Sequence, residues 1–453
     1  MKSNNLVYFY FFFILLLLNA YSCRKSDYVV EDDIVIIRDN GWGTGTTTWT
    51  NDKTYLLEGF VFVNDGQTLT IEHGTIIHAK IGQGSEASAL IVAKGGKIMA
   101  EGTSSEPVIF TVEGDDLDGS VPLDARGLWG GVIILGNARL NLSAGEAHIE
   151  GIPLSEPRGL YGGFDDEDNS GVFKYISIRH GGTNIGEGNE INGLTLGGVG
   201  SKTIIHHVEV ISIADDGFEF FGGNVNCSYL VAAFCEDDAF DYDIGYRGMG
   251  QFWFAVQEPS CGDKLIECNG GIDPIIGTPY SIPKIFNATL IGSGLLSGRK
   301  AMLFDRNAGG IVANSVVINQ SHGVYIEYIE NSDDSYKQFE NGNLEIKNNI
   351  FYDVADDTPD SVFMIAAAFG TDITSQSETF SAYFSLALNM IQDPEIEITE
   401  STIDPIPKGD IHNQLAPYPD TWYENVQFKG AFYTYNWLSG WTLLNESGYI
   451  KTD

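Results

Sequence analysis

The chain has 453 residues and carries 62 acidic against 25 basic side chains, which gives a formal net charge of −37. A surface this negative repels nucleic acid and anionic lipid headgroups, so we expect no nucleic-acid partner. After residue 22, no segment is apolar over the roughly 18 residues that mark a membrane-spanning helix, so we expect no crossing by helices.

Residues 1–22 are predicted to be a lipoprotein signal peptide rather than part of the fold. The apolar run at 6–18 is shorter than a membrane span and is typical of the core of a signal peptide. Small residues stand one and three positions before Cys23, and this order resembles the lipobox of bacterial lipoproteins, whose cysteine is acylated. The alternative is an ordinary secretory signal with a chance cysteine. Residues 23–50 are then predicted to be a polar tether.

Residues 51–355 contain an internal repeat of about 22 residues. The text at 69–79 recurs at 91–101, and the text at 208–223 recurs at 230–245, each time with apolar and turn positions aligned. Repeats of this length, made of short β-rich runs separated by Gly, Asn and Asp, are typical of a β-solenoid. The fold class is therefore predicted to be all-β, a parallel β-helix with three-sided coils.

Side-chain alternation within the short strands predicts which residues face the core. Phe218 and Phe220 should point inward and Glu219 outward, since successive side chains of a strand face opposite sides. Trp253 should lie on the face opposite its two Phe neighbours, either in the core or as an outward platform for sugar stacking. Asparagines at matching turns should bond backbone groups of the next coil, as ladders do. These are Asn287, Asn314 and Asn349.

Residues 356–453 are predicted to be an aromatic-rich C-terminal cap, because the last coil of a solenoid needs a cover. The runs 363–369 and 384–391 are expected to be helical. Three tryptophans are expected to pack within this cap, namely Trp422, Trp437 and Trp441.

Several stretches of the chain resemble large, mostly uncharacterised surface lipoproteins of Bacteroidota. The similar text includes TLTIEHGT, RGLWGGVIILGNA, YISIRHGG, DDGFEFFGG and FKGAFYTYNWLSGWTLL. The resemblance spans nearly the whole mature chain. It implies a right-handed parallel β-helix of the pectin-lyase-like kind, held at the outer membrane by its lipid and exposed to the outside; it implies no activity.

Acidic residues recur in register and form a predicted stack on one side of the helix. The stack contains Asp215, Asp216, Glu219, Glu236, Asp237, Asp238, Asp241 and Asp243. Crowded carboxylates repel unless a cation intervenes, and Ca²⁺ prefers oxygen ligands. Four residues are therefore candidate calcium ligands: Asp215, Asp216, Asp237 and Asp238. The alternative is that Asp-Asp-Gly is simply good turn chemistry before each strand.

The same stack could carry catalysis. In β-helical polysaccharide lyases, aspartates hold Ca²⁺ and a basic residue removes the sugar proton, so Asp237 and Asp241 with Arg247 are catalytic candidates by analogy. Paired carboxylates could instead act as acid and base in glycoside hydrolysis.

A second candidate calcium site lies in the acidic loop at 163–171. Asp166, Asp168 and Ser170 follow the spacing of the first half of a calcium loop, and a glycine completes the turn. The position where an EF-hand places Glu is Ser177, so the loop is not an EF-hand. An empty solvated loop is the alternative.

Four cysteines follow the predicted acylation site. In an oxidising compartment they permit two disulfides, and Cys261 with Cys268 is the pair that could close a loop. Cys227 and Cys235 could instead be small buried residues.

The leading hypothesis is a non-catalytic, calcium-stabilised lipoprotein of the cell envelope that binds glycan or another surface. The rival hypothesis is a polysaccharide lyase or glycoside hydrolase of the pectin-lyase-like class. Fold alone does not separate the two, because one architecture hosts many functions.

Overall fold

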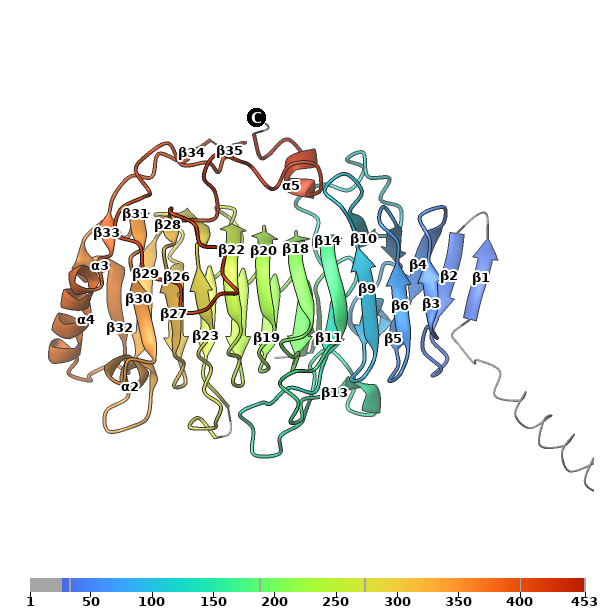
Figure 1. Cartoon of the computed structure of the whole chain (residues 1–453), viewed down its shortest axis with the longest axis horizontal. Coiled ribbons are helices and arrows are strands. Elements are labelled where there is room, and N and C mark those ends of the chain that lie inside the picture. The colour runs from blue at the N-terminus through green and yellow to red at the C-terminus, as the bar shows by residue number, and fades with distance from the viewer. Residues whose placement is uncertain (1–26, 32–33, 187–188, 273, 400, 452–453) are drawn as a thin grey trace, which may run out of the picture.

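The protein is a right-handed parallel β-helix (Figure 1), seen in a computed structural model that describes residues 27–31, 34–186, 189–272, 274–399 and 401–451. The coils stack along one long axis, from β1 at one end to the helices α3 and α4 at the other. The predicted signal peptide at 1–22 and Cys23 lie outside the described residues.

One side of each coil is a ten-stranded parallel sheet, which we name sheet B. Its strands are β5 (Phe60–Val63), β8 (Ala89–Val92), β11 (Val132–Leu135), β17 (Leu194–Gly197), β19 (Phe218–Phe221), β21 (Phe240–Asp243), β23 (Ile266–Asn269), β26 (Lys300–Asp305), β29 (His322–Glu327) and β32 (Phe363–Ala366). These strands lie in chain order from one end of the sheet to the other, as expected when each coil packs only on its neighbours.

The other two sides form a 19-stranded sheet, which we name sheet A. Its strands are β1 (Asp27–Glu31), β2 (Ile34–Arg38), β3 (Thr47–Trp49), β4 (Thr54–Glu58), β6 (Thr68–Ile71), β7 (Ile76–Ala79), β9 (Lys97–Glu101), β10 (Val108–Val112), β14 (Gly171–Arg179), β18 (Ile204–Ile211), β20 (Asn226–Ala233), β22 (Met249–Val256), β24 (Lys284–Phe286), β25 (Thr289–Gly294), β27 (Gly310–Ala313), β28 (Val316–Gln320), β30 (Leu344–Lys347), β31 (Ile350–Val354) and β33 (Met390–Ile391). The long strand β14 pairs with β9 through its first half and with β10 through its second, so it turns the corner between the two sides.

Smaller elements decorate the coils. Three antiparallel hairpins pair β12 (Ala147–His148) with β13 (Leu160–Tyr161), β15 (Thr183–Gly186) with β16 (Asn189–Ile191), and β34 (Glu397–Ile398) with β35 (Ile403–Asp404). Among the described residues, the helices are α2 (Ser335–Glu340), α3 (Pro359–Val362), α4 (Thr374–Leu386) and α5 (Leu443–Glu446), with 3₁₀ turns at Gly84–Glu86 and Pro157–Gly159.

The predicted 22-residue register is confirmed in the middle of the helix and wrong near its start. Phe218 pairs with Phe240, as the sequence repeat requires. Leu69, however, pairs with Ile98 rather than Ile91, because Ile91 belongs to β8 on a different side of the coil. Extra residues between β7 and β8 lengthen that coil and shift its register.

Aromatic side chains fill the centre of the middle coils. Phe218 and Phe220 face inward as predicted, and Trp253 joins them, with its ring 5.6 Å from Phe220 and 4.6 Å from Phe240 between centroids. Trp253 is fully buried. The alternative of an outward sugar-stacking platform at Trp253 is therefore wrong.

The predicted boundaries of the helix need correction at both ends. Within the predicted tether at 23–50, β2 pairs in parallel with β4, so coil structure begins before residue 51. At the other end, the run at 363–369 was expected to be helical, but it contains β32, which pairs with β29. Short apolar runs do not distinguish a buried strand from a helix. The run at 384–391 combines the end of α4 with β33.

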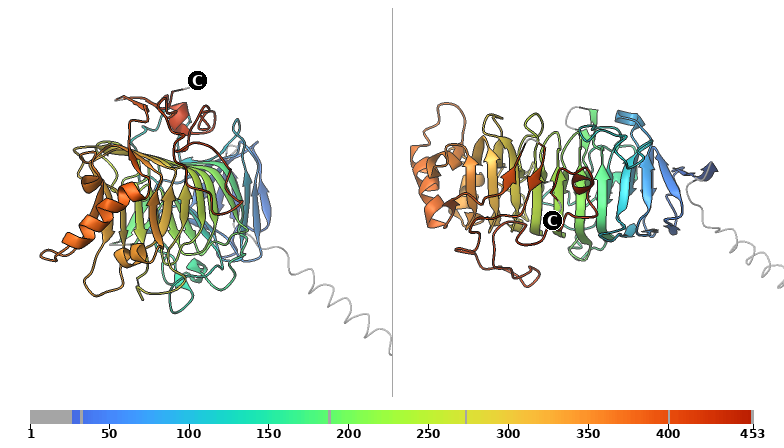
Figure 2. Two further views of the ribbon diagram at one scale, coloured as in Figure 1. Left: turned by 60° about the vertical axis from the view of Figure 1, so that its left-hand side comes forward. Right: turned by 90° about the horizontal axis from the view of Figure 1, so that it is seen from above.

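The C-terminal region divides into an end cap and a long return segment. In the cap, α4 covers the last coil, and its Phe380 stacks on Phe363 at 4.6 Å. Residues 405–451, which we name the strap, run back along the outside of sheet A toward β14 (Figures 1 and 2). Trp437 and Trp441 lie on the strap and pack on the outer face of sheet A instead of within an end cap.

Asparagine side chains bond the strap to the corner of sheet A. Asn287, Asn314 and Asn348 have left-handed backbone conformations in successive coils. The amide of Asn314 donates to Ala416 O at 3.0 Å and accepts from Ala416 N–H at 2.7 Å. The expected ladder between coils holds for Asn349, whose side chain donates to Val312 O at 2.9 Å.

A buried polar network fastens the far end of the strap. Glu209 of β18 accepts the N–H groups of Leu443 at 2.8 Å and Leu444 at 3.1 Å, at the start of α5. Arg179 of β14 forms an ion pair with Glu446 at 2.9 Å. The strap therefore joins coils that lie far from it in the sequence.

Candidate metal centre

The candidate site begins in the turns that lead from sheet A into sheet B. Asp215 and Asp216 lie between β18 and β19, and Asp237 and Asp238 take the same places one coil later. Asp238 N–H donates to Asp216 Oδ1 at 2.8 Å, which ties the two turns together. A side chain at Gly217 would place its Cβ 2.7 Å from Ala239 O, so glycine allows this close approach of coils.

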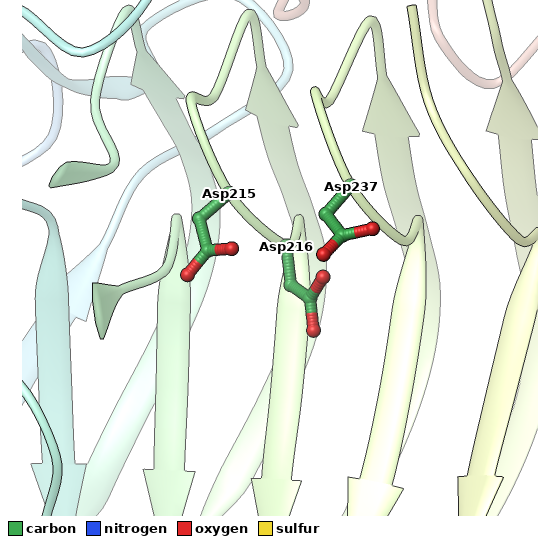
Figure 3. A group of neighbouring side chains, drawn as sticks. All are labelled: Asp215, Asp216 and Asp237. Carbon is green, nitrogen blue, oxygen red and sulfur yellow. The ribbon is translucent and has the colours of Figure 1, made fainter. Parts of the chain in front are cut away.

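Carboxylate oxygens converge in three overlapping groups. The groups are Asp215, Asp216 and Asp237; Asp216, Glu219 and Asp241; and Asp237, Asp238 and Asp263, with the ligand atoms of each group within 4.8 Å of one another. Figure 3 shows the first group, with Asp216 between the other two. Asp216 and Asp237 each belong to two groups, and Asp216 is the one that joins the turn carboxylates to Glu219 and Asp241 on the strands.

The outer face of sheet B continues the cluster. Glu219 pairs in register with Asp241, and Asp241 with Glu267, so three acidic side chains stand on successive strands. Asp241 is only 8% exposed, and within the described structure its Oδ1 atom has no hydrogen-bond partner. A buried carboxylate oxygen without a partner is costly, and a bound cation would satisfy it.

Insertions bring in further polar groups that the sequence reasoning missed. Asn192 donates one side-chain hydrogen bond to Glu219 and another to Glu150 at 3.3 Å. Glu190 lies in the β15–β16 hairpin, and its charge raises the pKa of Asp215. These residues stand outside the repeat, so no periodic signal marks them.

Lys264 neutralises one end of the cluster. Its Nζ atom lies 2.5 Å from Asp263, 3.3 Å from Glu267 and 3.5 Å from Asp238. Burial opposes its charge, but these carboxylates raise the pKa of Lys264 overall, so it stays protonated. In the described part of the chain, no lysine or arginine forms an ion pair with Asp216 or its partners Asp215, Glu219 and Asp241.

The electrostatics follow from this uneven distribution of charge. Burial, followed by the charges of Glu190, Glu150 and Asp237, raises the pKa of Asp215 to about 8. Burial and neighbouring carboxylates also raise the pKa of Asp216 well above its usual value, as they do for Glu219 and Asp241. Full ionisation at neutral pH therefore requires a positive charge among these groups.

The acidic loop at 163–171 is built differently. Asp166 accepts from Arg139 at 2.8 Å and also from Arg247. Burial opposes its ionisation, but the two arginines outweigh burial and lower its pKa to about 2. Asp168 accepts from Asn137 at 3.0 Å and from Ser170 Oγ at 3.2 Å. The loop oxygens thus already have partners within the chain, and none of the convergent acidic groups includes this loop.

Arg247 is not brought to the candidate catalytic aspartates. It follows β21, whereas Asp237 precedes β21, and a four-residue strand spans about 13 Å. Its guanidinium pairs with Asp166 and donates to Gly223 O at 3.2 Å. Arg247 is therefore engaged by Asp166 and lies away from Asp237, so the predicted catalytic set of Asp237, Asp241 and Arg247 is not assembled.

The predicted disulfide is also wrong. All four described cysteines are free thiols: Cys227, Cys235, Cys261 and Cys268. Cys268 points into the core from β23, while Cys261 lies in a turn and donates to Cys235 O at 3.2 Å. Strand alternation turns Cys268 inward, away from the turn that carries Cys261.

Comparison with known proteins gives one match. The family described as the pectate-lyase-like β-helix domain matches residues 41–383. No curated protein and no solved structure matches the chain. Among the described residues, no helix is long and apolar enough to cross a membrane. Since the matched region covers more than half of the chain and coincides with the coils, the chain belongs to the pectate-lyase-like β-helix domain family.

Proposed function

We propose that this protein is a non-catalytic β-helical scaffold of the cell envelope, stabilised by Ca²⁺ bound at the acidic cluster, that binds glycan or another surface. The observation that supports a bound cation is that two of the three-residue acidic groups share Asp216, together with the unpartnered oxygen of Asp241. A divalent cation there would offset the repulsion that raises these pKa values.

Calcium fits this donor set better than a transition metal does. Every ligand in the two groups around Asp216 is a carboxylate oxygen, and Ca²⁺ takes six to eight oxygen ligands in flexible geometry. The side chains of Asp215, Asp216 and Asp237 would hold the ion on one side. Glu219 and Asp241 would hold it on the other, while Lys264 serves as the fixed positive charge for Asp238 and Asp263.

The basic residues support a binding role over lyase chemistry. A lyase needs an unprotonated base that can take up the proton of the sugar. Lys264, the lysine that contacts the cluster, is held in its protonated form. Arg247 lies beyond the opposite end of β21 and is paired with Asp166. Neither Arg247, the base considered from the sequence, nor Lys264 is therefore available as the base of a lyase.

The predicted lipid anchor supports a place at the outer membrane. Acylation at Cys23 would attach the protein by the end of the helix that carries β1, leaving the long sides of the coils accessible (Figure 1). The negative surface is consistent with a solvated position outside the cell and with the absence of nucleic acid among its partners.

A melting experiment on the full-length chain in detergent tests the calcium site. At a Ca²⁺ concentration a hundredfold above Kd, binding to the folded state alone adds about 2.7 kcal/mol to stability. We expect a higher Tm in Ca²⁺ than in EDTA, and loss of this rise in Asp216→Asn. Asp305→Asn is the matched control, because Asp305 lies on the same sheet but outside the three carboxylate groups. An unchanged Tm at millimolar Ca²⁺ contradicts the proposal.

A further inference from the structure

A cavity lies between the strap and the corner of sheet A, away from the candidate metal centre. Its volume is about 320 Å³, which falls within the range of small-molecule sites, about 300–1,000 Å³. The walls are the side chains of the corner on one side and residues 424–437 of the strap on the other. None of the carboxylates of the candidate metal centre lines it.

The corner wall is a rigid aromatic ladder. Tyr175, His207, Tyr229 and Phe252 occupy equivalent positions in four successive coils, all with left-handed backbone conformations. Their ring centroids are 4.3, 4.2 and 4.7 Å apart along the column. The first two pairs are stacked and Tyr229–Phe252 is tilted. Because the rings contact one another along the whole column, the wall is formed before any ligand arrives, and this lowers the entropic cost of binding.

The strap wall combines a fixed carboxylate with exposed rings. Gln251 bonds both the N–H and the carbonyl of Glu424, at 2.8 and 2.9 Å. Tyr229 OH donates to Glu424 Oε1 at 2.7 Å, so this carboxylate has a set position at the cavity. Tyr433 and Tyr435 line the cavity and are 45% and 62% exposed, which leaves aromatic surface and hydroxyl groups open to a ligand.

The charge of the walls restricts the class of ligand. Glu424 is the one residue with a formal charge in the described lining, since burial lowers the pKa of His207 to about 3 and keeps it neutral. A single negative charge, on a chain with net charge −37, disfavours uronic acids and other anions. Hydroxyl groups, a carboxylate acceptor and aromatic surface together match a molecule with both apolar C–H faces and hydroxyl donors.

We propose that this cavity, bounded by Tyr229, Glu424 and Tyr435, binds one or two units of a neutral glycan. The inference rests on the proposed glycan-binding role and names its site, but it does not depend on the cation. Glu424 would accept hydrogen bonds from sugar hydroxyls, and the ring of Tyr435 would pack on a sugar face. The ladder would limit how deep the sugar enters.

The test uses the full-length chain in detergent, on an array of neutral and uronic-acid oligosaccharides, in EDTA and in Ca²⁺. We expect retention of neutral glycans in both conditions and at least tenfold weaker binding in Tyr435→Ala. Phe164→Ala is the matched control, since Phe164 is also an exposed aromatic residue and does not line the cavity. Equal melting temperatures for the two variants and the parent chain would show that the loss of binding is not a loss of folding.

Each other outcome overturns the site. Retention of uronic-acid glycans alone, or of no glycan, excludes a neutral sugar. Tighter binding of tetramethylammonium than of any neutral glycan would make the cavity a cation site formed by aromatic rings and Glu424. Neutral glycan binding that vanishes in EDTA but survives Tyr435→Ala would place the sugar at the acidic cluster. By contrast, the Tm could be unchanged by Ca²⁺ while neutral glycans still bind and depend on Tyr435. That result would contradict the calcium site alone and leave the glycan site standing.

Discussion

The acidic cluster beside sheet B and the aromatic corner of sheet A are built by the same device with opposite energetic results. Each places equivalent residues of successive coils one above another. At the corner, stacked rings from Tyr175 to Phe252 attract one another and are covered by the strap. Beside sheet B, stacked carboxylates such as Glu219 and Asp241 repel one another. Repetition in register therefore adds up the interaction between neighbouring copies, whether it is attractive or repulsive. A column of like charges needs a counter-charge, whereas a column of rings does not.

The largest expected effect is at the covered corner. Trp441→Ala removes a fully buried ring that contacts Tyr175 and His207, and large-to-small changes of this kind cost about 3–5 kcal/mol. Urea unfolding of the full-length chain measures the change. Phe369→Ala is the control, because Phe369 is fully exposed and should cost less than about 0.5 kcal/mol. A cost below about 1 kcal/mol for Trp441→Ala would mean that the strap contributes little to stability.

A substitution in the acidic cluster should raise the free energy of unfolding instead of lowering it. In EDTA at pH 8, Asp216→Asn should stabilise the protein by up to about 3 kcal/mol, the repulsion between two unit charges about 5 Å apart at an effective dielectric constant near 20. The amide oxygen can still accept from Asp238 N–H, so the turn keeps its hydrogen bond. Urea unfolding with and without Ca²⁺ checks both parts: a gain in EDTA and a smaller response to Ca²⁺. Destabilisation of the cation-free protein would show that repulsion does not dominate there.

The pH dependence of stability tests the acidic side of the comparison. Burial raises the pKa of Asp243 to about 6 and that of Asp305 to about 7, and Asp215 reaches about 8. Groups with raised folded-state pKa values bind protons more tightly when folded. Their contribution to stability is therefore complete below about pH 4 and is lost as the pH rises to about 8. In EDTA we expect a loss of at least about 2 kcal/mol between pH 5 and pH 8, because each pKa unit of such a shift is worth about 1.4 kcal/mol, and a weaker dependence in Ca²⁺. Denaturation at fixed pH values measures it, and a flat profile in EDTA would refute it.

The smallest effect is expected where the strap meets the asparagine column. Asn314→Gly removes both hydrogen bonds to Ala416 but keeps a residue suited to the left-handed conformation, so the cost should be about 1–2 kcal/mol. Asn331→Gly is the control, because Asn331 is also left-handed and is exposed. Urea midpoints compare the two, and equal midpoints would mean that water replaces the bonds to Ala416 without loss.

The sequence predicts the coil class and the middle register, because residues 208–223 and 230–245 repeat almost position by position. It predicts the acidic cluster for the same reason. It does not predict Glu150 or Asn192, which reach the cluster from insertions without a period.

The strap was missed for a different physical reason. An asparagine at a turn can bond either the next coil or another segment, and the side-chain pattern is the same in both cases. Asn349 bonds the next coil, whereas Asn314 bonds the strap about a hundred residues away in the sequence. Likewise, buried aromatic residues such as Trp441 look identical in an end cap and in a lateral cover.

The return path of the strap has a consequence for how the molecule unfolds. A solenoid held only by nearest-neighbour contacts can fray from its ends, one coil at a time. Here Leu443 is bound to Glu209 across a sequence separation of 234 residues. On its way to Leu443, the strap crosses the coils from β31 back to β22 and bonds to them. Opening any of these coils strains the closed loop of chain that contains it. The middle and last coils should therefore melt in one cooperative transition, and during synthesis that cooperativity should arise only after Leu443 and Leu444 have docked on Glu209.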